Sequence, residues 1–427
     1  MNANASRALN VCLHGTTLGT RFLFIFFLAK YLDPALVGYY GLFTATIGYA
    51  IYFVGLDFYT YVTREIIKTP DAKRGQLLKS QAALSGVLYL VLWPLALEFF
   101  SRSDWPGHLA WWFFPILVLE HFNQEMSRFL VAMSEQLTAS TILFVRQGSW
   151  AMAVVALMTW KPPSRDLDTV MMLWTLAGVT AASIGIWKLR QLRMGGWSSA
   201  INWGWIKKGI KVSIVFLAAT LALRGMQTID RYWLAALGGI EMVGAYVILL
   251  GVASTLMTFL DAGVFAYAYP ELIKLSHQQD HLAAKSKMRQ MLLQTVLFCA
   301  AFALISWLAL PHLLSWIGNP VYQKAQHWYP WLLMAMALNA LSMVPHFGLY
   351  AQGQDRHIIY SHIGALLVFV LSVWGLSHTY AALAVPVGLN IAYAFILLWK
   401  TAAYRLHTTA QNTPPVKTIP RVLTPNT

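Results

Sequence analysis

Charged residues are scarce in this chain. Asp, Glu, Lys and Arg together make up 11% of its 427 residues, whereas hydrophobic residues make up 58%. A soluble domain carries about 25% charged residues, so the composition excludes a large water-soluble domain, and the mean hydropathy of +0.54 predicts a membrane protein. Cysteine is scarcer still. Cys12 and Cys299 both lie in apolar segments, so neither a disulfide framework nor a cysteine-based metal site is predicted.

Catalytic signatures are also missing. The sequence contains no Gly-rich P-loop ending in Gly-Lys-Ser/Thr, no HExxH pair and no Gly-Xaa-Ser-Xaa-Gly turn. These absences argue against an ATP-driven cycle, a zinc protease and a serine hydrolase. Membrane glycosyltransferases and polymerases of this size usually carry a large outer loop, but every loop predicted here is short. The sequence therefore predicts neither an enzyme nor a cofactor.

Long apolar segments take up most of the chain. A helix needs about 20 mainly apolar residues to cross a bilayer, and twelve segments meet this need, those around Arg21 and Glu120 being the least hydrophobic. The predicted fold class is an all-α polytopic membrane protein with two lobes of six helices. The predicted spans are residues 8–30, 38–63, 80–100, 109–128, 138–160, 169–188, 209–236, 242–268, 290–310, 329–350, 358–376 and 381–399.

The distribution of Lys and Arg predicts the orientation. With both termini in the cytoplasm, 22 of the 31 Lys and Arg residues fall in cytoplasmic segments and only five in outer loops. This asymmetry follows the positive-inside rule, so the net charge of +14 reflects basic cytoplasmic loops and not nucleic-acid binding. The predicted domains are an N-terminal lobe (1–190), a cytoplasmic linker (191–206), a C-terminal lobe (207–405) and a disordered cytoplasmic tail (406–427).

The two halves of the sequence resemble each other. Span 2 contains Val-Gly-Tyr-Tyr-Gly-Leu-Phe from residue 37, and span 8 contains Val-Gly-Ala-Tyr-Val-Ile-Leu from residue 243, an offset of 206 residues. Asp57 and Asp261, which come after these two segments, are 204 residues apart. Arg21 and Arg224, which come before them, are 203 residues apart. Because six is an even number of spans, both halves of such a repeat have the same orientation in the membrane. The axis that relates them then lies along the membrane normal. Chance resemblance between apolar helices is the alternative.

Eight charged residues of the predicted spans are assigned to the membrane interior. Each costs about 2.5–3.5 kcal/mol at the centre of a helix, so each is expected to face protein or water rather than lipid. Polar residues also recur at helical spacing on spans 1, 4, 7 and 10, which predicts a water-accessible interior. The charged residues are Arg21, Arg146, Arg224, Arg231, Asp57, Glu120, Asp230 and Asp261. The stripes are Asn10, His14, Thr17 and Arg21 on span 1, and Glu120, Asn123, Gln124, Ser127 and Arg128 on span 4. They are Thr220, Arg224, Thr228 and Arg231 on span 7, and Asn339, Ser342, His346 and Tyr350 on span 10.

A structural role is the alternative for each of these residues. The four cations and four carboxylates can pair and simply hold the bundle together, most directly at Asp230 beside Arg231. Asp57 and Asp261 have no basic residue three or four positions away, and they fit either helix packing or the binding of a proton or sodium ion. Histidines in such spans are more typical of hydrogen-bonded side chains than of metal ligands. No metal site is predicted.

The N-terminal region resembles a known transporter family. It has Gly15 and Gly19 in the first span, Leu-Asp-Pro at 32–34 and Gly-Tyr-Tyr-Gly at 38–41. In this pattern the chain resembles the polysaccharide transporter branch of the multidrug/oligosaccharidyl-lipid/polysaccharide exporter superfamily, and most of all the O-antigen repeat-unit flippases of bacterial inner membranes. The match is specific over the first part of the chain, while the rest agrees in span number, loop length and the halfway repeat.

The resemblance implies a substrate and a set of site residues. The substrate would be an undecaprenyl-pyrophosphate-linked oligosaccharide, moved by alternating access from the cytoplasmic to the periplasmic leaflet, with H⁺ or Na⁺ as coupling ion and polysaccharide polymerase machinery as a possible partner. Related flippases receive the pyrophosphate on cationic residues in a central cavity. Arg21 fits that pattern, and the internal repeat adds Arg224. The other candidate substrate-binding residues are Arg146, Arg231, His14, Glu120 and Gln124, and the candidate ion-coupling residues are Asp57 and Asp261.

Three other functions remain open on the sequence alone. A multidrug exporter of the same fold would need a carboxylate on span 1 to attract a cation, where this chain has Arg21. A small-solute secondary transporter of twelve spans is equally compatible with the repeat. An O-antigen polymerase or ligase is disfavoured because the loops are short.

Overall fold

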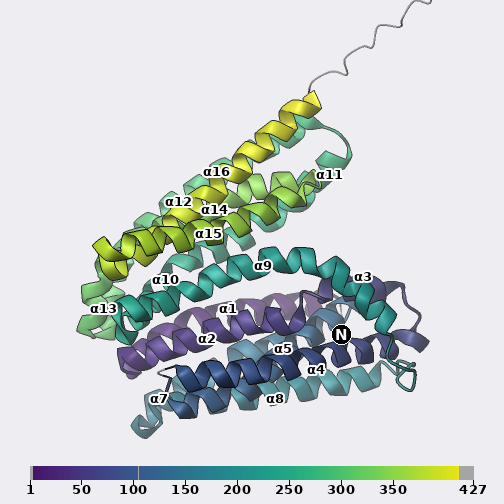
Figure 1. The fold of residues 1–427 in the computed structure, drawn as a ribbon, viewed down its shortest axis with the longest axis horizontal. Coiled ribbons are helices and arrows are strands. Elements are labelled where there is room, and N and C mark those ends of the chain that lie inside the picture. Colours follow the sequence, from purple (N-terminus) through teal and green to yellow (C-terminus); the bar gives the residue numbers. More distant parts are fainter. Residues whose placement is uncertain (1–2, 104, 413–427) are drawn as a thin grey trace, which may run out of the picture.

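The structure, a computed structural model, describes residues 3–103 and 105–412, and within them it contains helices and no strands (Figure 1). The helices fall into two lobes that lie one above the other in that view. The N-terminal lobe comprises α1 (Ala3–Tyr31), α2 (Pro34–Gly55), α3 (Tyr59–Lys68), α4 (Asp71–Arg102), α5 (Gly107–Ala132), α6 (Gln136–Phe144), α7 (Trp150–Trp160) and α8 (Leu167–Gln191). The C-terminal lobe comprises α9 (Trp203–Gly238), α10 (Ile240–Leu260), α11 (Ala266–His277), α12 (His281–Ile317), α13 (Pro320–Lys324), α14 (Tyr329–Ala351), α15 (Asp355–Tyr380) and α16 (Ala384–Asn412).

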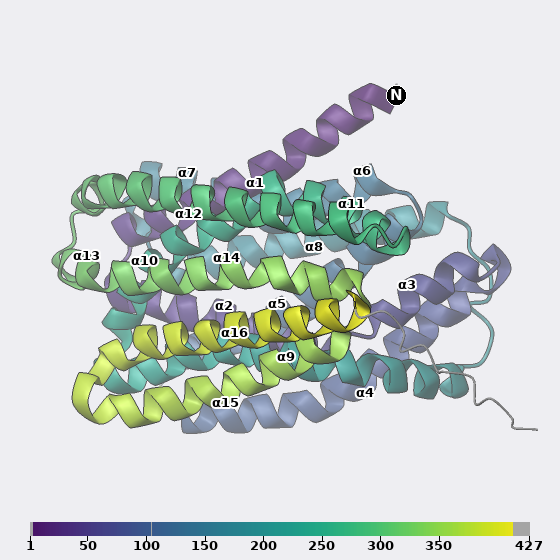
Figure 2. The ribbon, with the colours of Figure 1, turned by 90° about the horizontal axis from the view of Figure 1, so that it is seen from above.

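Twelve helical spans are present among the described residues. Ten stretches are long and apolar enough to cross a membrane, and one of them, 355–408, contains both α15 and α16. The more polar α5 is not among the ten, but it crosses the N-terminal lobe beside α8 (Figure 2). The predicted fold class is confirmed, and the chain is a multi-pass membrane protein.

Two predicted boundaries differ from the structure. The span predicted at 38–63 is interrupted, because Leu56 and Asp57 have φ angles of 50° and 49°, a left-handed conformation that ends α2 and begins a turn into α3. Asp57 therefore lies at a helix break and not inside a continuous helix. At the other end of the chain, α16 continues through residues 406–412, which were predicted as tail. The rest of the predicted disordered tail, 413–427, lies outside the described residues.

Local sequence signals explain where several helices begin and end. Pro34 begins α2, where its missing N–H costs nothing. The side chains of Asp166, Asn202 and Asp280 accept backbone N–H groups at the starts of α8, α9 and α12, which satisfies donors that a helix start leaves free. Gly318, with a φ of 82°, ends α12 in the left-handed conformation that glycine adopts without strain.

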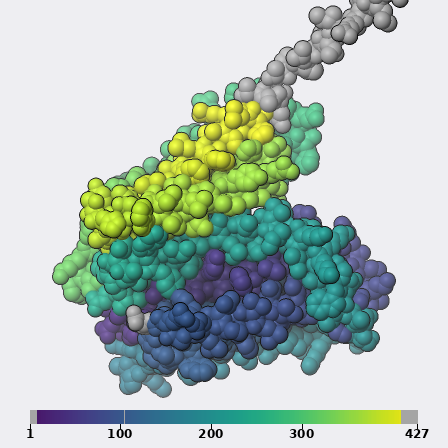
Figure 3. Space-filling model, viewed as in Figure 1, coloured from purple at the N-terminus to yellow at the C-terminus, as the bar shows by residue number. Residues whose placement is uncertain are grey.

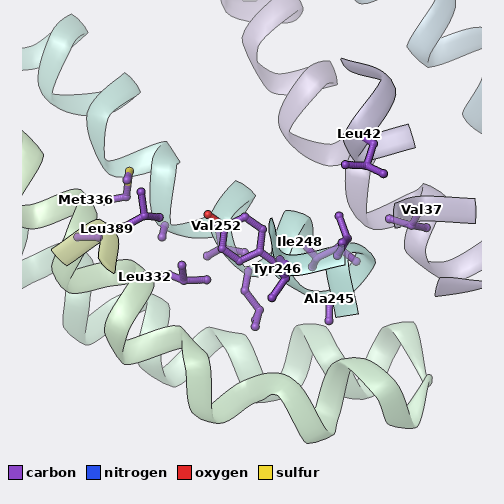
Figure 4. Packing of buried hydrophobic residues seen from close by; sticks show 14 of the residues in the cluster. Val37, Leu42, Ala245, Tyr246, Ile248, Val252, Leu332, Met336 and Leu389 are labelled. Carbon is purple, nitrogen blue, oxygen red and sulfur yellow. The ribbon is translucent and has the colours of Figure 1, made fainter. Parts of the chain in front are cut away.

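The two lobes meet where α2 and α10 begin, and the contact is symmetric. A Cβ placed on Gly38 would lie 2.1 Å from the carbonyl oxygen of Ile240, and one on Gly244 would lie 2.2 Å from the carbonyl oxygen of Pro34. Gly38 and Gly244 are related by the repeat offset of 206 residues, as are Pro34 and Ile240, so each half presents the same surface to the other. Only glycine permits this approach of two backbones. Buried apolar residues such as Val37, Ala245 and Ile248 pack around the contact (Figure 4).

A second contact closes the same end of the molecule. The ammonium group of Lys30, at the end of α1, donates to the carbonyl oxygen of Trp316 of α12 at 2.8 Å and lies 4.0 Å from the centre of its ring. We call this end, where α2 and α10 begin and α7 and α12 finish, the closed end. Towards the opposite end, which we call the open end and where α3 and α11 lie, the lobes diverge (Figures 1 and 3).

Candidate substrate cavity

Two adjoining cavities lie between the first helices of the two lobes. The smaller, of about 410 Å³, lies mainly in the N-terminal lobe, and the larger, of about 960 Å³, lies between the lobes. Arg21 of α1 and Arg224 of α9 line both of them, as do Thr44 and Gly48 of α2. We call the two together the central cavity.

One wall of the central cavity holds a buried ion pair. Arg146 lies in a π-helical turn, Val145–Ser149, that joins α6 to α7, and its Nη1 lies 3.3 Å from Oε2 of Glu120. Trp174 donates its indole N–H to the other carboxylate oxygen of Glu120 at 2.8 Å. The charges of Arg146 and Glu120 therefore offset each other. π-Helical turns inside α-helices occur frequently at functional sites.

The opposite wall holds a second neutralised pair. Asp230 of α9 is 1% exposed, and its carboxylate accepts a hydrogen bond from the hydroxyl of Tyr246 at 2.6 Å. Arg231 lies 3.6 Å from the same carboxylate and also donates to the carbonyl oxygen of Gln227. Asp230 thus has the structural role that the sequence left open for it, because both of its oxygens are occupied within the C-terminal lobe.

Arg21 and Arg224 differ from these pairs because neither contacts a carboxylate among the described residues. Arg21 donates to the amide oxygen of Gln147 at 2.9 Å. Arg224 donates to the amide oxygen of Gln227 at 3.3 Å and lies over the ring of Tyr52 at 5.3 Å. Amide and aromatic partners position a guanidinium group without cancelling its charge. The central cavity therefore carries two positive charges that no side chain neutralises.

The structure brings most of the predicted substrate-binding residues together. Six of the seven line the central cavity: Arg21, Arg146, Arg224, Arg231, Glu120 and Gln124. His14 is not among the lining residues, and its Nε2 lies 3.0 Å from the hydroxyl of Ser140 at the contact between α1 and α6. The roles of all seven residues stay predictions.

The two predicted coupling carboxylates lie outside the central cavity. Asp57 is buried at the turn between α2 and α3 and accepts a hydrogen bond from Thr220 of α9. Asp261 is exposed and begins a π-helical turn, Asp261–Phe265, at the end of α10. Both residues of the repeat thus lie where a helix departs from regular α geometry. Neither forms an ion pair among the described residues, and the pairing of Asp57 with Arg146 that the sequence allowed is not present.

Sequence reasoning missed several polar residues of the site. Gln147 and Gln227 hold Arg21 and Arg224, and each follows an arginine closely in an apolar segment, which is the signal that was available. The prediction that intramembrane histidines form hydrogen bonds agrees with His121, which contacts the hydroxyl of Tyr89 at 3.1 Å. No cluster of three or more metal-ligating side chains occurs in the part of the chain that the structure describes.

The polar stripes lead to a labelling prediction. Gln124 and Thr228 line the central cavity, whereas Thr17 is 3% exposed and Ser342 is fully buried. In a protein without Cys12 and Cys299, we expect cysteines at 124 and 228 to react with a membrane-impermeant maleimide and cysteines at 17 and 342 to remain unlabelled. Equal labelling of all four positions would contradict the cavity described here.

Comparisons with known proteins agree with this architecture. The family model described as "Polysaccharide biosynthesis protein" matches residues 7–248, whereas no protein with a curated description matches the sequence. The inward-facing structure of a multidrug resistance MATE family transporter of the MOP superfamily is similar over 92% of this chain and 96% of its own, with 12% identity and a TM-score of 0.77. The outward-facing structure of such a transporter covers 95% and 96% at 12% identity, with a TM-score of 0.62.

A third solved structure is a MATE transporter of Vibrio cholerae, VcmN in the bent form. It is 14% identical over 96% of this chain and 99% of its own, with a TM-score of 0.56. At these identities the likeness shows the fold, which is that of two-lobed membrane transporters. The TM-score is higher with the inward-facing structure, at 0.77, than with the outward-facing one, at 0.62.

Proposed function

Because this chain belongs to the polysaccharide biosynthesis protein family, whose model matches more than half of it, we propose that it is a flippase for a lipid-linked oligosaccharide. The substrate in this proposal is an undecaprenyl-pyrophosphate-linked repeat unit of the O-antigen type, moved from the cytoplasmic to the periplasmic leaflet. The fold supports a transporter and not an enzyme, since the structural neighbours are membrane transporters.

The unneutralised charge of the central cavity is the observation that carries this proposal. Arg21 and Arg224 face one space from opposite lobes, and a pyrophosphate that links a lipid to a sugar is a dianion that must leave the headgroup region to cross. Guanidinium groups bind phosphate oxygens in pairs of parallel hydrogen bonds. Two of them replace part of the hydration that the pyrophosphate loses, while the polyprenyl chain stays in lipid at the gap between lobes.

A drug exporter of the same fold is the second candidate, supported by the MATE neighbours. An exporter of cationic drugs needs a carboxylate that is free to attract its substrate. The two carboxylates that line the central cavity, Glu120 and Asp230, are occupied by Arg146, Arg231, Trp174 and Tyr246. The charge of the cavity therefore favours an anionic substrate.

The orientation and the energy source are part of the same proposal. The protein lies in a bacterial inner membrane with both termini in the cytoplasm, so the open end faces the cytoplasm and receives the substrate there. Alternating access then opens the closed end to the periplasm. H⁺ or Na⁺ binding supplies the driving force, with Asp57 and Asp261 as the carboxylates that sequence reasoning assigns to it.

The sidedness of the lipid-linked intermediate tests the proposal. In cells that lack the protein, we expect surface polysaccharide to disappear and the lipid-linked repeat unit to accumulate on the cytoplasmic leaflet, protected from an impermeant lectin in intact spheroplasts. The wild-type gene should restore both. Accumulation on the periplasmic leaflet would instead indicate a polymerase or ligase, and normal polysaccharide with raised drug sensitivity would indicate a drug exporter.

A further inference from the structure

The C-terminal lobe contains a buried basic cluster that the central cavity does not use. Lys400 of α16 is 1% exposed. Its Nζ lies 3.1 Å from Nδ1 of His346 on α14 and 3.2 Å from Nε2 of His362 on α15. The hydropathy pattern predicts a last span that ends at residue 399, with Lys400 among the cytoplasmic residues. The structure instead places its ammonium group between three helices of the lobe.

Among the described residues, no carboxylate forms an ion pair at this cluster. The titratable groups that act electrostatically on His346 and His362 are Lys400 and, for His346, the other histidine. On the neighbouring helices, Glu271 of α11 pairs with Lys287 of α12, and Asp230 of α9 pairs with Arg231. Asp355 lies at the start of α15, the helix that carries His362.

Hydrogen-bond chemistry limits the cluster to one charge. An ammonium group only donates, so both ring nitrogens that face Lys400 must accept, and both imidazoles are then neutral. A second proton would place two like charges about 3 Å apart in a dry environment, which is strongly unfavourable. The three side chains therefore form a unit that is either neutral or singly protonated.

A cavity and further titratable groups lie between this cluster and the open end. A cavity of about 400 Å³ at that end is lined by Gly348, Gln352 and Tyr404, and Tyr404 lies one helical turn beyond Lys400 on α16. Near the same end, the Nε2 atoms of His357 and His407 lie 2.9 Å apart and join α15 to α16. Both histidines are partly exposed. Titratable groups thus continue from the solvent-facing end of the lobe towards Lys400.

We propose that Lys400, His346 and His362 form a proton-binding site that is loaded from the open end. Its occupancy controls the change between the open arrangement, which is the one described here with the lobes apart at the open end, and the alternate arrangement, in which they are apart at the closed end. The assignment rests on the proposed function, since only a transporter of this kind needs a coupling ion. It places the coupling site between α14, α15 and α16, whereas the sequence predicts it at Asp57 and Asp261.

Burial gives the direction of the effect. A positive charge at Lys400 costs free energy in the arrangement described here, because the side chain is buried and has no counter-ion among the described residues. Protonation therefore favours an arrangement that admits water to the cluster. Acidification depletes the open arrangement, and a proton bound in only one of two arrangements changes their ratio by up to about tenfold per pH unit.

A distance measurement at the open end tests this without any substrate. Ile67 of α3 and Leu282 of α12 are exposed there on opposite lobes, so spin labels on cysteines at these positions report the opening in the full-length protein, in a background lacking Cys12 and Cys299. We expect the population with the longer distance to fall on acidification. Lys400→Met should abolish this response, His362→Gln should shift its midpoint, and Lys274→Met, at an exposed lysine of α11, should leave it unchanged.

Two results would overturn the proposal. One is a pH response in Lys400→Met as large as in the wild type, and the other is no pH response in the wild type at all. Asp57→Asn is the contrasting variant, because loss of the response there, with Lys400→Met unaffected, would assign coupling to the N-terminal lobe. None of these outcomes depends on Arg21 or Arg224. The flippase proposal is therefore tested separately, by the sidedness assay.

Discussion

Arg21→Ala and Arg224→Ala proteins are expected to insert normally and to lose transport of the lipid-linked oligosaccharide. Hydrogen bonds to a charged group contribute about 1.5–3 kcal/mol each, so removing one guanidinium should weaken pyrophosphate binding by roughly 10- to 100-fold. The double variant should show no transport above background. The measurement is the rate at which a fluorescent lipid-linked oligosaccharide becomes accessible on the far side of proteoliposomes.

Lysine substitutions separate charge from geometry. Arg21→Lys and Arg224→Lys keep the positive charge but lack the planar pair of donors, so we expect only partial transport. Arg190→Ala is the matched control, because Arg190 is an exposed arginine at the end of α8, away from the central cavity. Near-normal transport in both alanine variants would remove the pyrophosphate role of these two arginines.

The sequence predicted the cavity residues because a charge inside an apolar segment is conspicuous. Arg21, Arg146, Arg224 and Arg231 lie inside the predicted spans, and helices bury such groups against protein or water for a clear energetic reason. What the sequence could not predict was which charges cancel. That depends on contacts between distant helices, such as Arg146 with Glu120, which are 26 residues apart along the chain.

Local backbone geometry explains the predictions that differed from the structure. The residues around Asp57 include no proline, and Gly55 is the only glycine nearby. The break between α2 and α3 therefore has no strong sequence signal, although Leu56 and Asp57 both adopt positive φ angles. Lys400 was misplaced for a different reason. A single cation after Trp399 is typical of the end of a span. Only the packing of α14, α15 and α16 shows that Lys400 is buried.

The repeat offset, by contrast, has a counterpart in three dimensions that the sequence did not predict. Residues 37–43 and 243–249 were matched by sequence alone, and their glycines form the symmetric contact of α2 with α10. Two copies of one surface can meet in this way only around a two-fold axis. The contact gives the two lobes a common point near which each can tilt. The close approach of the two backbones depends on Gly38 and Gly244, because glycine has no side chain.

Alanine at Gly38 or Gly244 is therefore expected to disturb the closed end. The added Cβ would lie 2.1 or 2.2 Å from a backbone carbonyl oxygen, which no side-chain rotation relieves. Overpacking of this kind costs about 1–3 kcal/mol and acts only on the arrangement in which the lobes touch. The population of that arrangement should fall roughly 5- to 150-fold relative to one that separates α2 from α10.

A neighbouring helix supplies a control for this last prediction. Gly86 of α4 has no atom within 4 Å of an added Cβ and does not line the central cavity, so Gly86→Ala changes helix propensity alone and should favour α4 by about 1 kcal/mol. Spin labels on cysteines at Lys161 and Lys324, which are exposed at the closed end on opposite lobes, measure the separation. We expect a longer distance and slower transport in Gly38→Ala and Gly244→Ala but not in Gly86→Ala. If the three variants gave the same distances, the α2–α10 contact would not be what holds the closed end together, and the rocking of two lobes about it would have to be abandoned.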